Sequence, residues 1–171
     1  DDIKRANDIV GFNEPVLGNF PNIKLNNVDH IKLVNFIEKQ IEEYDPSRIF
    51  THHPADLNND HLQVSRACVA SSRLFQRKEG LSNLESLHYM EVLSSTDWSF
   101  SDGNVFQPNL YVEISEQIES KINALKEYKD VMREFPHPRS EEIIRGLASY
   151  RGGQSKQFYS EAFQTIFKRE I

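Results

Sequence analysis

The chain has 171 residues, 38% of them hydrophobic, with a formal net charge of −6 and a single cysteine. This length suits one domain spanning residues 1–171 with an apolar core of its own. The acidic balance argues against nucleic acid as a partner, because phosphate binding needs a basic surface. No apolar run approaches the ~18 residues of a membrane span. With Cys68 alone, neither an intrachain disulfide nor a cysteine zinc site can form, which fits a reducing compartment such as the cytoplasm.

The N-terminal residues are not typical of the start of a domain. Residue 1 is Asp rather than Met, and the opening stretch Asp1–Arg5 resembles the middle of a helix. We therefore expect the chain to be a piece of a longer protein whose first strand or strands precede it.

The first half of the chain predicts a helix, a strand, a polar loop and a second helix. Apolar residues spaced three or four apart predict a helix over 28–41, with Asn27 as its N-terminal cap. A buried strand is expected over 48–51, followed by a polar loop and a helix from about residue 60 with Asn59 as its cap. This order is typical of an α/β unit with a parallel sheet.

The second half predicts one more strand and three more helices. The strand is expected at 89–93, and a hairpin-like excursion at 97–114 turns around Ser101–Asn104. Amphipathic patterns predict helices over 118–132, from Ser140 to Gly152-Gly153, and around 158–166. The expected core includes three aromatic residues near the end of the chain: Phe158, Phe163 and Phe167.

The polar loop carries the strongest candidate for chemistry. Three of the six histidines, His52, His53 and His61, lie within ten residues together with Asp56 and Asp60. Imidazole and carboxylate groups suit zinc when no thiolate is available. The loop also follows a strand and enters a helix, which is where α/β proteins place their ligands.

These five side chains cannot all bind one ion. In an extended strand His52 and His53 point to opposite faces, so at most one of them faces the site. Asp60 and His61 diverge by about 100° on a helix, so one binds the ion while the other has a supporting role. The competing interpretation is a capped loop, in which Asp and Asn serve only as turn residues. Both interpretations remain open at this point.

Two residues outside this loop are weaker candidates. His137 lies between two prolines, where it either presents a hydrogen-bond donor to a cleft or forms an exposed corner. Arg139 either contacts an anionic substrate or lies on the surface. No glycine-rich nucleotide motif is present in the chain.

The stretch Thr51–His61 resembles the second metal motif of the LmbE/PIG-L family of zinc-dependent N-deacetylases. Further stretches resemble the same family in the same order, so that the resemblance covers nearly all of the chain: Phe106–Asn109 leading to Ile114–Ser115, Lys121–Tyr128, Pro136–Ser140, Tyr150–Gln154 and Tyr159–Phe163. The resemblance implies a Rossmann-like three-layer α/β sandwich with a mainly parallel sheet. It also implies hydrolysis of an N-acetyl group on an amino sugar or sugar conjugate, and leaves assembly as a homo-oligomer open.

In that family one zinc ion is held by a His and an Asp of an N-terminal His-Pro-Asp-Asp motif and by the His of a later Asp-His pair. By resemblance His61 is the later ligand and Asp60 its supporting neighbour, with His53, Asp56 and Arg139 around the substrate or behind the ligand. The chain has no His-Pro-Asp-Asp motif. The general base and two zinc ligands are therefore expected outside it, and the chain alone should be inactive.

Asn58 marks a departure from the family pattern. Many members have a histidine there, which could steady the oxyanion, whereas Asn58 can donate a hydrogen bond but cannot carry charge. His53 or His137 is a candidate for the missing positive group. Two competing functions stay open: another metallohydrolase, such as a phosphoesterase, and a non-catalytic carbohydrate-binding protein.

Overall fold

The computed structural model describes residues 2–100 and 104–170, so the centre of the expected excursion at 101–103 lies outside the described residues. Two compact units divide the chain. The first joins the chain up to Leu17 with Tyr111–Ala162, and the second joins Gly18–Leu110 with the chain from Phe163 onward. A single domain over 1–171 remains a prediction. No helix in the described ranges is long and apolar enough to cross a membrane.

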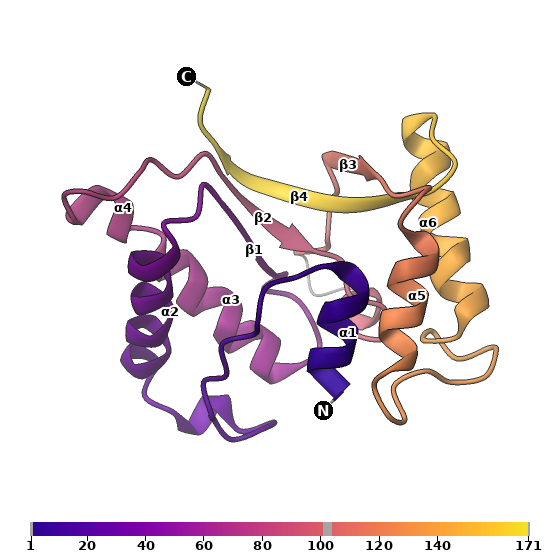
Figure 1. Ribbon diagram of the computed structural model, residues 1–171, viewed down its shortest axis with the longest axis horizontal. Helices are drawn as coiled ribbons and strands as arrows, with labels where there is room; N and C mark the ends of the chain where they lie inside the picture. The colour runs from indigo at the N-terminus through magenta and orange to yellow at the C-terminus, as the bar shows by residue number, and fades with distance from the viewer. Residues whose placement is uncertain (1, 101–103, 171) are drawn as a thin grey trace. The chain divides into compact units, whose positions relative to one another are not determined.

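The second unit contains the elements around the histidine loop. They are η1 (Leu25–Asn27), α2 (His30–Tyr44), β1 (Arg48–His52), α3 (Asn59–Ser71), α4 (Leu74–Arg77), β2 (Ser86–Met90) and η2 (Thr96–Trp98). Helix α3 packs against α2, η1 and β1 (Figure 1). The core between these elements is built from Leu25, Leu33, Val34 and Ala67. Apolar residues of α2 thus cover one side of α3. The first turn of α3 lies next to the end of β1.

The sheet has the strand order β1-β2-β4-β3 and is mixed, so the expectation of a mainly parallel sheet is wrong. Strands β1 and β2 run parallel, with Arg48 opposite Ser86 and His52 opposite Met90. Strand β4 (Ser160–Lys168) runs antiparallel to β2. The α/β class holds, because the parallel pair is joined through α3 and α4.

Strand β4 occupies a stretch that was predicted to be a helix. Phe158, Ala162 and Ile166 recur every four residues, which suits a helix, but pairing with β2 imposes an extended backbone. The aromatic residues are not all core: Phe158, which precedes the strand, is 83% exposed, and Phe167 is 44% exposed. Phe163 packs edge-on against Phe50.

Helix boundaries also differ from the predicted ones. The N-cap of α2 is Asp29 rather than Asn27, and the N-cap of α3 is Asn58 rather than Asn59. Strand β2 begins three residues earlier than predicted, at Ser86. These shifts are small, but the shift in α3 makes Asn58 the N-cap of that helix.

The first unit consists of α1 (Asp2–Val10), α5 (Ile118–Lys126) and α6 (Glu141–Ser155), together with most of β3 (Leu110–Glu113) and the first residues of β4. Helix α1 packs along α5, and α5 contacts α6 (Figure 1). Arg5 of α1 forms an ion pair with Glu127, with Nε and Oε2 2.6 Å apart. Helix α5 ends at Lys126, earlier than the predicted helix over 118–132.

Gly152 and Gly153 offer a paired test of packing in α6. The helix does not end at them as predicted but continues to Ser155. A methyl group on Gly152 would lie 2.6 Å from the carbonyl oxygens of Gln157 and Phe158, whereas one on Gly153 would meet nothing within 4 Å. We expect Gly152→Ala to lower the free energy of unfolding by about 1–3 kcal/mol. Gly153→Ala should raise it by about 0.5–1 kcal/mol. Urea unfolding of both variants checks this, and equal effects would contradict the packing.

Candidate functional site

The loop between β1 and α3 is folded by its own polar groups. The backbone N–H of Asp56 donates to the carbonyl of His53, with the nitrogen and oxygen 3.1 Å apart, and this hydrogen bond closes a turn. The side chain of Asn58 accepts the N–H of Asp60 at 2.9 Å and so caps α3. The capped-loop interpretation of this segment is therefore correct for Asn58. The cap fixes the start of α3 and with it the position of His61 in the first turn of that helix.

Asp56 lies at the centre of this loop with its side chain fully buried. Its Oδ1 accepts hydrogen bonds from the N–H of Asn58 at 2.8 Å and from the hydroxyl of Ser95. Its Oδ2 accepts the hydroxyl of Thr96 at 3.3 Å. Burial alone would raise the pKa of Asp56, but contacts with His61, Ser95 and Asn58 outweigh it and hold the pKa below its usual value.

His61 faces the second oxygen of Asp56. Its Nδ1 lies 2.9 Å from Oδ2, within ion-pair distance but without the geometry of a hydrogen bond. The Nε2 atom makes no hydrogen bond to any described residue, and the side chain is 24% exposed. A histidine with one nitrogen against a carboxylate and the other free is the usual form of a metal-binding histidine.

The ring of His52 stacks on the ring of His61, with centroids 3.9 Å apart and planes 15° from parallel. Burial and the nearby His61 lower the pKa of His52 to about 4. His52 is therefore neutral near pH 7 and holds the plane of the His61 ring by packing rather than by charge.

The stacked pair predicts a stability loss in mild acid. His52 titrates near its ordinary value of 6.5 when unfolded and at about 4 when folded. Between these values the unfolded state binds the proton first, so stability rises with pH and is lost as pH falls through this window. The loss attributable to His52 is about 3 kcal/mol. Urea unfolding across this range measures it, and His52→Asn should flatten the dependence; an unchanged slope in that variant would contradict the assignment.

His53 lies next in the chain but is buried apart from this stack. Its Nδ1 accepts the N–H of Ala55 at 3.1 Å, so the ring hydrogen resides on Nε2. The ring packs edge-on against Tyr89 and Phe106. Burial lowers the pKa of His53, which works against the positive group for which it was a candidate.

Asp60 points away from His61 to the backbone that precedes α2. Its carboxylate accepts the N–H of Ile23 at 2.5 Å and the N–H of Leu25 at 3.0 Å. Ile23 has a φ of 56°, an uncommon conformation for a β-branched residue. Asp60 thus holds the approach to η1 in place beside the start of α3.

His137 and Arg139 belong to the first unit, and their roles stay predictions. The N–H of Arg139 donates to Nδ1 of His137 at 3.0 Å, within a turn that leads to the Ser140 cap of α6. Nε of Arg139 is buried without a hydrogen-bond partner among the described residues.

The described residues do not form a complete metal site. Over residues 2–100 and 104–170 no group of three or more His, Cys, Asp or Glu side chains is placed to hold one ion. One side chain is arranged like a metal ligand: His61 faces a buried carboxylate with Nδ1 and keeps Nε2 free. The residues present around His61 therefore suit zinc at the level of one ligand.

The stacking of His52 on His61 and the contacts of Ser95 and Thr96 with Asp56 were not predicted from the sequence. His52 was assigned to one of two opposite strand faces without a partner, and Ser95 and Thr96 had no role. The hydroxyls lie about forty residues beyond Asp56, and no spacing rule connects them to the loop. The only available signal was that the end of β2 lies beside the end of β1 in a parallel pair.

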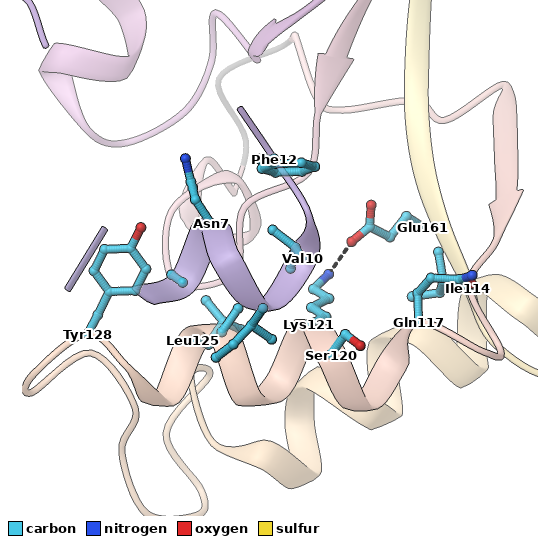
Figure 2. A pocket seen from close by; sticks show the side chains of 13 residues that line it. Asn7, Val10, Phe12, Ile114, Gln117, Ser120, Lys121, Leu125, Tyr128 and Glu161 are labelled. Carbon is cyan, nitrogen blue, oxygen red and sulfur yellow. Dashed lines mark hydrogen bonds and ion pairs between the residues drawn. The ribbon is translucent and has the colours of Figure 1, made fainter. Parts of the chain in front are cut away.

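The first unit contains a separate pocket of about 430 Å³ between α1 and α5 (Figure 2). Its walls are mostly apolar, and the ion pair between Lys121 and Glu161, 2.5 Å apart, lies at one end. Its volume is in the range of small-molecule sites. None of the predicted site residues lines it.

Comparisons with known proteins give fold relatives only. No family model and no curated protein matches the chain. Among solved structures, a conserved protein from Thermus thermophilus has a TM-score of 0.77 at 22% identity, covering 99% of this chain and 73% of that one. The 4-carboxy-2-hydroxymuconate hydratase GalB from Pseudomonas putida has a TM-score of 0.74 at 17% identity, covering 99% and 71%.

An N,N'-diacetylchitobiose deacetylase from Pyrococcus horikoshii has a TM-score of 0.73 at 16% identity, covering 96% of this chain and 61% of that one. At these identities the likeness concerns the fold alone. The chain therefore has an α/β fold like that of a chitobiose deacetylase and of a hydratase.

Proposed function

We propose that this chain forms part of a zinc-dependent N-deacetylase that acts on N-acetylated amino sugars or their conjugates. The observation that carries the proposal is the contact between Nδ1 of His61 and the buried Asp56, which leaves Nε2 free at the start of α3. The deacetylase-like fold and the resemblance of Thr51–His61 to a zinc-deacetylase motif support the same reaction.

His61 would contribute Nε2 as one ligand, and a His and an Asp from a His-Pro-Asp-Asp motif outside this chain would complete the set. Bound zinc would polarise the acetyl carbonyl and lower the pKa of bound water. Asn58 uses its Oδ1 as the helix cap. Its Nδ2 makes no hydrogen bond to the described residues and would donate to the oxygen that becomes charged. His137 and Arg139 remain candidates for substrate contacts.

The test is an assay of amine release with zinc-loaded protein. The chain is expressed alone and fused to an N-terminal segment that carries a His-Pro-Asp-Asp motif, and each is incubated with N-acetylglucosamine and N,N'-diacetylchitobiose. We expect free amine from the fused protein and none from the chain alone. A folded, zinc-loaded fusion that releases no amine from any N-acetyl sugar would refute the proposal.

The similarity to the hydratase supports a second candidate, the addition of water to a carbon–carbon double bond of an unsaturated carboxylate. One fold commonly hosts several reactions, so the fold does not choose between them. Loss of ultraviolet absorbance from a conjugated dicarboxylate, without amine release from N-acetyl sugars, would favour the hydratase. Hydrolysis of a phosphate ester would favour a phosphoesterase, and sugar binding that survives chelation and His61→Ala would favour a carbohydrate-binding protein.

A further inference from the structure

The two oxygens of the Asp56 carboxylate have different partners. Oδ1 accepts the backbone N–H of Asn58 and the hydroxyl of Ser95. Oδ2 faces Nδ1 of His61 at 2.9 Å and accepts the hydroxyl of Thr96. The Thr96 oxygen itself accepts the N–H of Val92 at 2.9 Å, which leaves its hydroxyl hydrogen for Asp56. Asn58, Ser95 and Thr96 thus each present a donor to Asp56.

An ionised carboxylate can only accept hydrogen bonds. The nitrogen of His61 that faces Oδ2 must then carry the ring hydrogen, because a bare nitrogen there would set two lone pairs against each other in a buried position. In the neutral ring the hydrogen is absent from Nε2, whose lone pair is left free.

We propose that Asp56 is a positioning residue that keeps the ring hydrogen of His61 on Nδ1, and that Ser95 and Thr96 belong to the site because they hold Asp56. The inference rests on the proposed function, in which Nε2 of His61 binds zinc. It assigns a role to the 92–97 turn, which comes from a part of the chain outside the histidine loop.

The Asp56→Asn substitution separates this role from simple packing. The backbone N–H of Asn58 can only donate, so the new amide must place its carbonyl oxygen at the position of Oδ1. Its NH2 group then takes the position of Oδ2 and donates to Nδ1 of His61. The ring hydrogen is displaced to Nε2 at constant shape, as when an amide replaces the carboxylate beside a catalytic histidine.

The experiment is ¹⁵N NMR of the histidine rings in the metal-free chain at mildly alkaline pH, with the His61 signals assigned from a His61→Gln variant. We expect Nδ1–H in the natural chain and Nε2–H in Asp56→Asn. Asp97→Asn is the matched control, because Asp97 accepts the N–H of Ser95 in the same turn but does not contact His61. It should keep Nδ1–H, and Ser95→Ala with Thr96→Val should weaken the preference.

Nε2–H in the natural chain, or Nδ1–H in a folded Asp56→Asn variant, would overturn the inference. Zinc titration of the fusion carrying the His-Pro-Asp-Asp motif forms a separate arm, in which Asp56→Asn should weaken zinc binding about 10- to 100-fold and Asp97→Asn should not. An unchanged affinity in Asp56→Asn would also count against the inference. A tautomer switch in a fusion that binds zinc but releases no amine would refute the deacetylase proposal alone.

Discussion

Replacing His61 with alanine is expected to abolish zinc-dependent amine release by the fused protein, by roughly 10³-fold or more. The metal supplies several kcal/mol of transition-state stabilisation, and each 1.36 kcal/mol corresponds to a tenfold change in rate. Among the described residues, His61 is the histidine whose free ring nitrogen is backed by a buried carboxylate partner. Zinc content by mass spectrometry and amine release should fall together.

His30→Ala provides the control for this prediction. His30 is exposed at the first position of α2 and has no role in the loop around Asp56. The variant should retain zinc and activity. If His61→Ala retained stoichiometric zinc and full amine release, His61 would not be a ligand, and another residue would have to take its place.

Replacing Asp56 with alanine is expected to lower the free energy of unfolding by about 3–5 kcal/mol, the cost of removing one partner from a buried charged network. The change leaves the Asn58 N–H, the Ser95 and Thr96 hydroxyls and Nδ1 of His61 without their acceptor. This is a large share of the roughly 5–15 kcal/mol that stabilises an ordinary domain. Urea unfolding followed by circular dichroism measures it.

Asp97→Ala is the matched comparison, because it removes a carboxylate that accepts one backbone N–H in the same turn. It should cost about 1–2 kcal/mol. The pKa of Asp56 is lowered on folding, so its contribution is present above its unfolded value of 3.8 and is lost as pH falls through the folded value. Equal costs for the two variants at neutral pH would show that Asp56 is not the centre of the network.

The fold was predictable where the sequence pattern is local. The helix at 30–44 and the strand at 48–52 follow from apolar spacing, and Asp45 ends the helix with a left-handed φ of 42°. The final strand was not predictable in this way. Ser160–Lys168 has a helical spacing of apolar residues, and only pairing with β2, some seventy residues away in the chain, makes it extended.

In the candidate site, too, local features could be predicted from the sequence and long-range contacts could not. The divergence of Asp60 and His61 follows from their adjacency on a helix. In the structure Asp60 accepts the backbone N–H of Ile23 while His61 faces Asp56. The stack of His52 on His61 could not be foreseen, because it depends on where α3 starts relative to the end of β1. The roles of His137 and Arg139 depend on their position relative to the histidine loop, which cannot be predicted from the order of residues in the sequence.

The turn that holds Asp56 also contains the only tryptophan of the chain. Trp98 ends η2, and its backbone N–H donates to the carbonyl of Ser95 at 3.2 Å. The residue is 49% exposed, and its ring lies beside that of Phe100. Indole emission responds to the water around the ring, so its intensity and colour register any loosening of this turn. The residue that follows Asp97 is thus a built-in fluorescent reporter on the structure of this turn, and it needs no added label.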